Sequence, residues 1–587
     1  MTAGDRGARI AEIQRELETL PKGSISRKTI NGKVQCYLQW RENGMNRSKY
    51  ISHADVPALE EAVARRRALK EELSRLTGTR VPNDIYYSDV MTGDDLDDMI
   101  RSVEGFGRRD SYPVLKQYVD KGVDGHVCIL YGLRRTGKTT MMRQAIADLS
   151  PEERARAAYI MASSDLDVHV LSRDLRTLHG QGFRYVFIDE VTAIPDFIDG
   201  AAIISDLYAT MGMRIVLSGT DSLGFHLSKI DELYGRTITI HTTWIPFGEY
   251  SRLMGAWDID EYIRLGGILH PNEISLDQAE EFSPFSTAWG TDRYVLMSIS
   301  RNIQNSLEHH RGGERFHLLF EPYSKGELIG MIGRVIEDMN RGLLEETLAM
   351  LAEQGDGAGR LAGMLADALE SRPRLPGVSE DQALLIGENL KTVDLVDRYK
   401  IERYPARATE FHTVFTQPGM RYRQAAALLD SLLEDPSLKA LGSEDIRHIR
   451  EMVDGFICGV MMEDIVLYET TRYLRDKMVF KYTFDSGEYD MVVYDPDTAT
   501  CMLYEVKHST AVVLEQRRHL NDPKLLAIVR RMYGKVTGRY VIYLGEPTVA
   551  DDGVEYLNVA DYLCGLRPST GQASTGTGRR APARRFR

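Results

Sequence analysis

The sequence predicts a multidomain α/β protein with a parallel β-sheet core. Its 587 residues exceed the roughly 250 to 300 at which single hydrophobic cores stop growing, so we expect three or four domains. From Gly125, short apolar strands alternate with amphipathic helices, which is typical of a parallel sheet. Residues 255–450 carry mostly helical patterns, and strands return beyond residue 450.

The composition, with 43% hydrophobic and 27% charged residues, is that of a soluble globular protein. The net charge of -13 argues against a uniformly basic surface. No run of about 18 uncharged apolar residues and no signal peptide is visible, so we expect a cytoplasmic protein without a membrane partner. The five cysteines form no CxxC pair, which argues against a zinc site or a disulfide framework.

Residues 1–80 predict a small β-sheet with a helix. Asn31-Gly32 and Asn43-Gly44 are hairpin signals, because type I′ turns need positive φ at both central positions. Basic residues in this segment would suit a nucleic-acid backbone, while a solvated sheet face or a docking surface explains them equally well. They are Lys22, Arg27, Lys28, Lys33, Arg41, Arg47 and Lys49. A polar connector follows over residues 81–110.

In the core predicted over residues 111–254, a glycine-rich loop follows the first apolar strand. The stretch HVCILYGLRRTGKTT fits the pattern GxxxxGK[ST], and an amphipathic helix follows it. In this pattern backbone amides cradle phosphates, Lys138 reaches the β and γ oxygens, and the Thr139 hydroxyl binds Mg²⁺. The loop therefore predicts ATP and Mg²⁺ as cofactors. The predicted ATP-binding residues are Gly132, Leu133, Arg134, Arg135, Thr136, Gly137, Lys138, Thr139 and Thr140.

A second apolar strand, YVFIDEV, ends in two acids about fifty residues later, as such a nucleotide site requires. Asp189 would hold the magnesium through water, and Glu190 would act as general base. A third strand ends at Ser218 and Thr220, which are suited to sense the γ-phosphate. Arg236 is a candidate to stabilise the transferring phosphoryl group across a homo-oligomer interface or on domain closure, or else a structural ion-pair partner.

Residues 451–565 carry a second set of chemically suitable side chains. Asp490 begins one apolar strand, and Glu505 and Lys507 share a face of the next, since strand residues i and i+2 point the same way. Such a D…ExK set can hold Mg²⁺ through Asp490 and Glu505, while Lys507 positions or deprotonates the attacking water. Glu463 on the preceding helix is a further candidate metal ligand, as is Glu469. The alternative is an edge strand with merely solvated charges.

Five stretches between about residue 105 and residue 270 resemble the successive motifs of prokaryotic AAA-type ATPases of the archaeal-ATPase-like group. They are YGLRRTGKTT, FIDEVTAIPDF, IVLSGTDSLGF, LYGRTITIHTTWIPFGEY and YIRLGGI. The resemblance implies a P-loop NTPase core, a helical or winged-helix lid over residues 255–450, and an arginine near Arg236.

Many members of this group end in a restriction-endonuclease-like domain catalogued as a domain of unknown function, and residues 451–565 look similar to it. The helix motif of that domain fits Gly459, Glu463, Val466 and Glu469 in register. Two positions depart from the usual pattern: Tyr489 stands where a valine is usual, and Asn302 where an aspartate is common. Residues 566–587 predict a disordered basic tail.

The leading functional expectation is an ATPase that couples nucleotide turnover to a nuclease-like domain acting on DNA. The alternative is a nucleotide switch whose terminal domain only binds a partner protein or nucleic acid. A third reading, a remodeller of proteins, predicts hydrolysis stimulated by polypeptide rather than by DNA.

Overall fold

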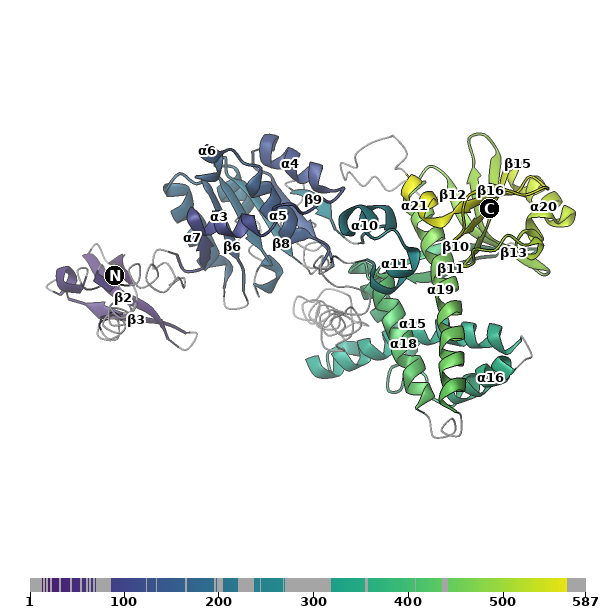
Figure 1. The fold of residues 1–587 in the computed structure, drawn as a ribbon. Coiled ribbons are helices and arrows are strands. Elements are labelled where there is room, and N and C mark those ends of the chain that lie inside the picture. The colour runs from purple at the N-terminus through teal and green to yellow at the C-terminus, as the bar shows by residue number, and fades with distance from the viewer. Residues whose placement is uncertain are drawn as a thin grey trace, which may run out of the picture.

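The computed structural model describes most of residues 86–269, 318–434 and 442–566, together with three strands and isolated residues before them (Figure 1). Within these ranges the gaps are residues 123, 134, 164–165, 195–196, 198–203, 220–236, 243, 268, 354–356 and 407. Arg134, Thr220, Arg236, Asn302 and the tail from residue 567 therefore lie outside the described residues.

The amino-terminal strands form an antiparallel sheet in the order β1-β2-β3. Its strands are β1 (Ser24–Ile30), β2 (Lys33–Glu42) and β3 (Met45–Ile51). Ile30 pairs with Lys33 and Glu42 with Met45, so each connection spans two residues. These connections fall on the two Asn-Gly pairs that the sequence identifies as hairpin turns.

A six-stranded sheet in the order β4-β6-β7-β8-β5-β9 holds the nucleotide-site residues. All neighbours are parallel except β4 and β6. The strands are β4 (Asp89–Met91), β5 (Val127–Tyr131), β6 (Ala157–Met161), β7 (Tyr185–Asp189), β8 (Arg214–Gly219) and β9 (Thr237–His241). Four of them, β5 to β8, are almost entirely buried, as expected of a parallel sheet covered on both faces.

Helices cover both faces of this sheet, and each face has its own apolar cluster. One cluster contains side chains of α3 (Asp94–Arg101), α4 (Tyr112–Lys121) and α5 (Lys138–Ala147). The other contains side chains of α7 (Val168–Gly180) and the short η2 segment (Ile204–Ala209). The carboxyl ends of the central strands are thereby left for the nucleotide loop.

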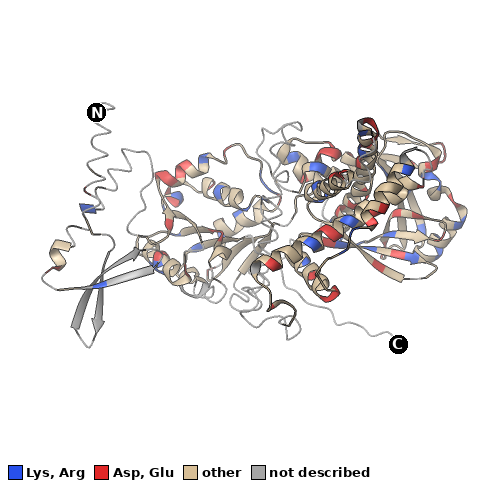
Figure 2. Ribbon diagram, turned by 90° about the horizontal axis from the view of Figure 1, so that it is seen from below, with Lys and Arg blue, Asp and Glu red and all other residues tan. Residues whose placement is uncertain are grey.

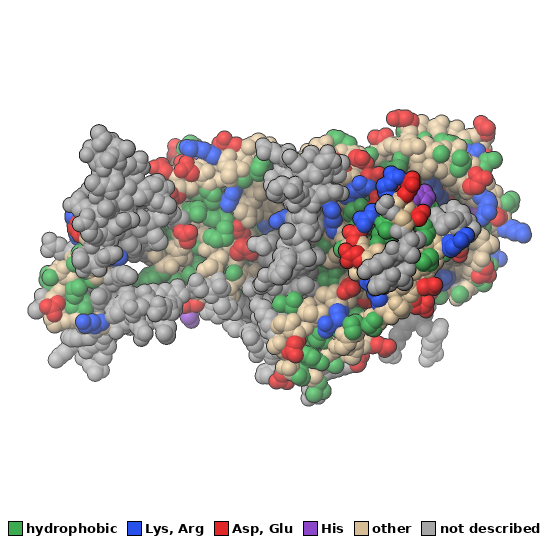
Figure 3. All heavy atoms as spheres, turned by 60° about the horizontal axis from the view of Figure 1, so that its bottom comes forward, with side chains coloured by type: hydrophobic (Ala, Val, Ile, Leu, Met, Phe, Trp, Pro, Cys, Tyr) green, Lys and Arg blue, Asp and Glu red, His purple; other side chains and the backbone are tan. Residues whose placement is uncertain are grey.

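Helices and a hairpin follow the core. The helices are α10 (Phe247–Met254), α11 (Ile259–Leu265), α15 (Lys325–Ala352), α16 (Gly357–Glu370), α17 (Glu380–Thr392), α18 (Pro418–Leu433) and α19 (Ser443–Tyr473). Strands β10 (Val396–Tyr404) and β11 (Ala408–Phe415) form the hairpin. Figure 2 shows basic and acidic residues interspersed over these elements, and the face in Figure 3 mixes charged and hydrophobic side chains.

The carboxyl-terminal sheet has eight strands in the order β11-β10-β12-β13-β14-β15-β17-β16. Its remaining elements are β12 (Met478–Phe484), β13 (Gly487–Asp495), β14 (Thr500–Lys507), α20 (Pro523–Tyr533), β15 (Lys535–Tyr543), β16 (Thr548–Val549), β17 (Glu555–Asn558) and α21 (Val559–Gly565). The candidate acids lie on β13 and β14, in the middle of this sheet. Both strands are paired on either side.

Two expected boundaries differ from the structure. The boundary at residue 450 falls inside α19, because its apolar residues continue at helical spacing through residues 443–473. The β10–β11 hairpin lies in the segment expected to be mostly helical, and it joins the carboxyl-terminal sheet through parallel pairing of β10 with β12. The lid segment therefore contributes two strands to the β-sheet of the carboxyl-terminal unit.

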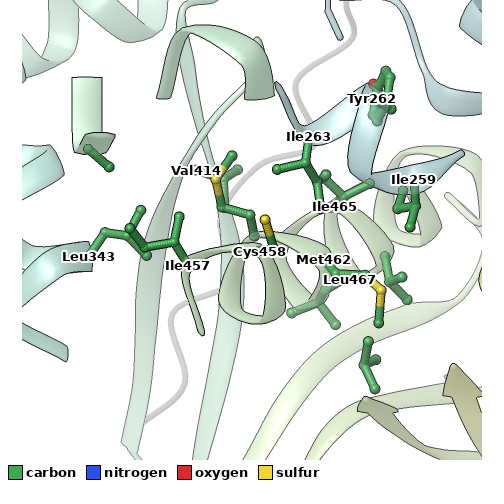
Figure 4. Close-up of a cluster of buried hydrophobic side chains, with 14 of the residues drawn as sticks. Ile259, Tyr262, Ile263, Leu343, Val414, Ile457, Cys458, Met462, Ile465 and Leu467 are labelled. Carbon is green, nitrogen blue, oxygen red and sulfur yellow. The ribbon is translucent and has the colours of Figure 1, made fainter. Parts of the chain in front are cut away.

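The boundary at residue 254 separates α10 from α11, yet both helices contribute to one core with α19. Figure 4 shows Ile259, Tyr262 and Ile263 of α11 beside Cys458 and Ile465 of α19. Helix α10 thus belongs by its packing to the carboxyl-terminal unit. In the part of the chain that the structure describes, no helix is long and apolar enough to cross a membrane.

Candidate nucleotide and nuclease-like sites

The predicted nucleotide loop connects β5 to α5. Gly132 and Gly137 have positive φ values of 138° and 86°, and a Cβ on Gly132 would lie 2.6 Å from the carbonyl oxygen of Thr242. Both positions therefore require glycine. Because α5 begins at Lys138, its first backbone N–H groups are not used within the helix and face the loop.

Two side chains of the loop are held by its own backbone or by a neighbouring segment. The buried Lys138 ammonium donates to the carbonyls of Gly132 (2.9 Å) and Leu133 (2.6 Å). The Thr136 hydroxyl donates to the Leu133 carbonyl at 2.7 Å and lies 3.0 Å from the Thr242 hydroxyl. Leu133 and Thr136 are buried, Arg135 is exposed, and Thr140 is half-buried on α5.

The predicted magnesium residues Thr139 and Asp189 are brought together. The Thr139 hydroxyl donates to Asp189 Oδ2 at 2.6 Å, and the predicted sensor Ser218 donates to Oδ1. Tyr159 on β6 adds a third hydrogen bond to Asp189, at 2.7 Å. The Asp189 carboxylate and the Thr139 hydroxyl are oxygen donors of the kind that Mg²⁺ prefers, so the residues present fit that ion.

Glu190 follows Asp189 at the carboxyl end of β7, with φ of 57°, and its backbone N–H donates to Asp189 Oδ1 at 3.0 Å.

If Glu190 activates the attacking water, the Glu190→Gln variant should bind ATP but hydrolyse it at least about a hundredfold more slowly. Binding of a fluorescent ATP analogue and phosphate release measure the two properties. The exposed Glu152→Gln serves as control, and wild-type turnover by Glu190→Gln would contradict the role.

The second candidate site brings Asp490 of β13 together with Glu505 and Lys507 of β14. Lys507 Nζ lies 2.9 Å from Asp490 Oδ2 and 2.9 Å from Glu505 Oε2. The Val506 N–H donates to Asp490 Oδ2 at 2.7 Å. Only 4% of Asp490 and 3% of Glu505 is exposed, and β14 is an inner strand, so the reading of solvated charges on an edge strand is wrong.

The charges of this site are mutually dependent. Burial and the charge of Asp490 raise the pKa of Glu505. Burial alone would raise the pKa of Asp490 as well, but Lys507 and Lys481 bring it below its usual value. The carboxylates outweigh the burial of Lys507 and raise its pKa. Lys507 is therefore a cation at neutral pH, which favours positioning and charge neutralisation over proton abstraction.

Glu463 on α19 lies near this site and pairs with Lys481. Lys481 was not identified from the sequence. Lys481 Nζ on β12 lies 3.5 Å from Glu463 Oε2 and 2.8 Å from Glu488 Oε1. Burial and the nearby Asp490 raise the pKa of Glu463. The sequence signal for Lys481 was a single charged residue within an otherwise uncharged strand, MVFKYTF.

His519 is a second missed neighbour, with Nδ1 3.7 Å from Glu505 Oε1. It lies in the short η5 turn (His519–Asn521), where no periodic pattern indicates a direction for its side chain. Among the described residues, no group of three His, Cys, Asp or Glu side chains is arranged to hold a metal ion.

The expectation that Glu469 adds a ligand to this site is wrong. It follows Glu463 by six residues, which turns it by about 240° around the helix. Its Oε1 atom instead accepts hydrogen bonds from the Phe247 N–H (2.8 Å) and the Tyr262 hydroxyl (3.3 Å). Burial raises the pKa of Glu469 to about 8, although these two hydrogen bonds act to lower it.

This raised pKa predicts a pH-dependent stability. Between about pH 4.5, the ordinary value, and about pH 8, the folded chain holds a proton on Glu469 that the unfolded chain releases. The free energy of unfolding therefore falls as pH rises through this window, by an amount on the order of a few kcal/mol. Glu469→Gln removes the effect, so its melting temperature relative to wild type should rise by several degrees from about pH 5 to about pH 8.

The exposed hairpin variant Glu410→Gln is the matched control for this measurement. Scanning calorimetry at several pH values measures the difference. A Glu469→Gln difference that does not change with pH would contradict the buried, proton-holding carboxyl.

Two family models match the chain. Residues 124–251 match a model described as an AAA domain, and residues 5–61 match one described as a domain of unknown function (DUF6788). The first match contains the glycine-rich loop, Asp189 and Ser218. The chain therefore carries an AAA-type P-loop ATPase domain that binds and hydrolyses nucleotide, and this part of the sequence prediction is confirmed.

No curated protein matches the sequence significantly. Among solved structures, Aeropyrum pernix ORC1 in complex with DNA matches at 15% identity and TM-score 0.22, over 57% of this chain and 94% of that one. A katanin self-assembly structure matches at 17% identity and TM-score 0.20, over 38% of this chain and 83% of that one. Drosophila ORC bound to AT-rich DNA and Cdc6 matches at 12% identity and TM-score 0.18, over 56% of this chain and 95% of that one. TM-scores this low do not establish a shared overall fold.

Proposed function

We propose that the protein couples ATP turnover to a magnesium-dependent nuclease-like site that acts on DNA. The observation that carries the proposal is the pair of buried carboxylates, Asp490 and Glu505, bridged by the half-buried Lys507 on two adjacent inner strands. Two carboxylates and a cation on adjoining strands can act together on a phosphodiester. This arrangement supports a restriction-endonuclease-like fold for the carboxyl-terminal unit.

Asp490 and Glu505 are the residues that would hold Mg²⁺, which proteins usually bind through one or two carboxylates together with substrate phosphates. Among the described residues, Glu505 Oε1 makes no hydrogen bond and has His519 Nδ1 3.7 Å away, so this buried oxygen is suited to a cation. When bound, the ion would lower the pKa of a water and stabilise phosphate charge. Lys507 would orient the attacking water and offset the charge of the scissile phosphate.

At the nucleotide site, Lys138 would contact the β and γ phosphates, and Thr139 and Asp189 would hold a second Mg²⁺. Ser218, together with Thr220, would sense the γ-phosphate. Arg236 would act from a neighbouring copy in a homo-oligomer. The basic residues of the amino-terminal sheet would add a second DNA contact, and the protein would work in the cytoplasm.

A second candidate function is a nucleotide-controlled binding platform that does not cut. It is favoured by the pairing of each acid with a lysine: Lys507 bridges Asp490 and Glu505, and Lys481 bridges Glu463 and Glu488. Acids neutralised in this way can stabilise the fold without a metal ion. The platform would bind a partner protein or nucleic acid when ATP is bound.

The deciding experiment incubates the purified chain with linear, supercoiled and single-stranded DNA, with and without Mg²⁺ and with and without ATP. We expect fragments only when Mg²⁺ is present. If the chain hydrolyses ATP but leaves all three DNAs intact under every condition, the nuclease proposal is wrong. ATP-dependent DNA binding without cleavage would support the platform instead.

A further inference from the structure

Two buried carboxylates hold the first turn of helix α10, namely its own Glu249 and Glu469 of α19. Within α10, Glu249 pairs with Arg109, which lies in the segment between α3 and α4. At its first residue, the Phe247 N–H donates to Glu469 of α19. The N-cap residue, Pro246, makes no side-chain cap, so Glu469 caps the helix from outside.

Arg109 connects α10 to the nucleotide loop. Its Nε lies 2.6 Å from Glu249 Oε1, its Nη2 donates to the Trp244 carbonyl at 3.1 Å, and its Nη1 donates to the carbonyl of Thr136. Only 7% of Arg109 and 5% of Glu249 is exposed. The Asp110 N–H adds a further hydrogen bond to Glu249 Oε1, at 2.7 Å.

The bond to Thr136 fixes an amide of the loop. In a trans peptide the carbonyl and the following N–H point in opposite directions. By holding the Thr136 carbonyl, Arg109 directs the Gly137 N–H away from itself. A Cβ on Gly137 would lie 3.5 Å from Arg109 Cγ, so the side chain also packs against the loop. Amides of this loop are the groups that cradle phosphates.

The same first turn of α10 leads to the nuclease-like site through Glu469. Glu469 lies on the same helix as Glu463, which faces that site, so α19 contacts both. Helix α10 also packs closely on α21, because a Cβ on Gly248 would lie 3.3 Å from the Cα of Cys564. In so tightly packed a region, a shift of α10 is passed to its neighbours.

We propose that Arg109, Glu249 and Glu469 are positioning residues that join the phosphate-binding loop to α19 through α10. Nucleotide held by the loop is thereby coupled to the helix that borders the nuclease-like site. The inference takes its biological purpose from the proposed function. The two experiments below measure nucleotide affinity and amide hydrogen exchange. Their outcome is therefore independent of whether the protein cleaves DNA.

The first arm removes the link without leaving a buried charge. Replacing a buried ion pair by apolar residues is often neutral for stability, whereas removing one partner costs about 3–5 kcal/mol. The double variant Arg109→Met/Glu249→Leu leaves no buried charge but removes the partners of the Asp110 N–H and of the Thr136 and Trp244 carbonyls. It should therefore stay folded with a lower melting temperature and bind a fluorescent ATP analogue about tenfold more weakly. Arg109→Lys, which keeps the charge but not the forked geometry, should recover part of the affinity. Wild-type affinity in a folded double variant would overturn the inference.

The second arm measures amide hydrogen exchange of α19 in the full chain, with and without a non-hydrolysable ATP analogue at saturating concentration. We expect the analogue to slow exchange at the α10–α19 contact in wild type by about fivefold or more. Glu469→Gln, which keeps the acceptor oxygen, should retain this change, and Glu469→Leu should lose it. No change in wild type, or an unaltered change in Glu469→Leu, would overturn the inference.

Discussion

The Lys138→Ala variant is expected to lose ATP hydrolysis by about a hundredfold or more. Lys138 is the buried cation of the loop, with its ammonium within 2.9 Å of two loop carbonyls. Charge that develops on the phosphates during transfer would lose its main cationic partner, and the loss of one such preorganised contact commonly costs about a hundred- to a thousandfold in rate. Phosphate release at saturating ATP and Mg²⁺ measures the effect.

Lys121→Ala, on the exposed end of α4, is the matched control and should hydrolyse ATP at the wild-type rate. Since Lys138 also donates to the Gly132 and Leu133 carbonyls, its loss can loosen the loop, and thermal unfolding shows whether the domain stays folded. Undiminished hydrolysis by folded Lys138→Ala would mean that this loop is not the nucleotide site.

The second large effect is expected for Lys507→Ala, which should lose DNA cleavage by about a hundredfold or more while it retains ATP hydrolysis. Lys507 is within 2.9 Å of both candidate metal-binding carboxylates. Without it, Asp490 and Glu505 share a buried space, and like charges there favour protonation of one of them. A protonated carboxyl binds Mg²⁺ poorly, and the scissile phosphate loses a cationic neighbour.

Lys524→Ala on the exposed side of α20 is the control for cleavage. Lys507→Arg preserves the charge and should keep the fold, although its planar head group does not reproduce the position of the ammonium. Cleavage by Lys507→Ala at the wild-type rate would show that the proposed role of Lys507 is wrong.

The nucleotide site was predictable from the sequence because its parts are local. The glycine-rich loop needs positive φ at fixed positions between a strand and a helix, and Asp189 ends an apolar strand. Placement of Asp490, Glu505 and Lys507 also followed from local rules, since residues i and i+2 of a strand share a face. Neighbouring strands then brought the three together.

The contacts that surround these residues were not predictable, because they join distant parts of the chain. Arg109 and Glu249 are 140 residues apart, and Phe247 and Glu469 are 222 apart. A single sequence contains no signal for such pairs. Glu469 was misassigned because a motif gives the register of a helix but not which neighbour covers each of its faces.

The most direct test of the account is the rate of Mg²⁺-dependent DNA cleavage in the presence of ATP, compared between wild type and Lys138→Ala. We expect ATP to change the wild-type rate several-fold, and we expect Lys138→Ala no longer to respond to ATP, although its Asp490, Glu505 and Lys507 are intact. Equal cleavage rates in both proteins, with and without ATP, would contradict the coupling of the two sites.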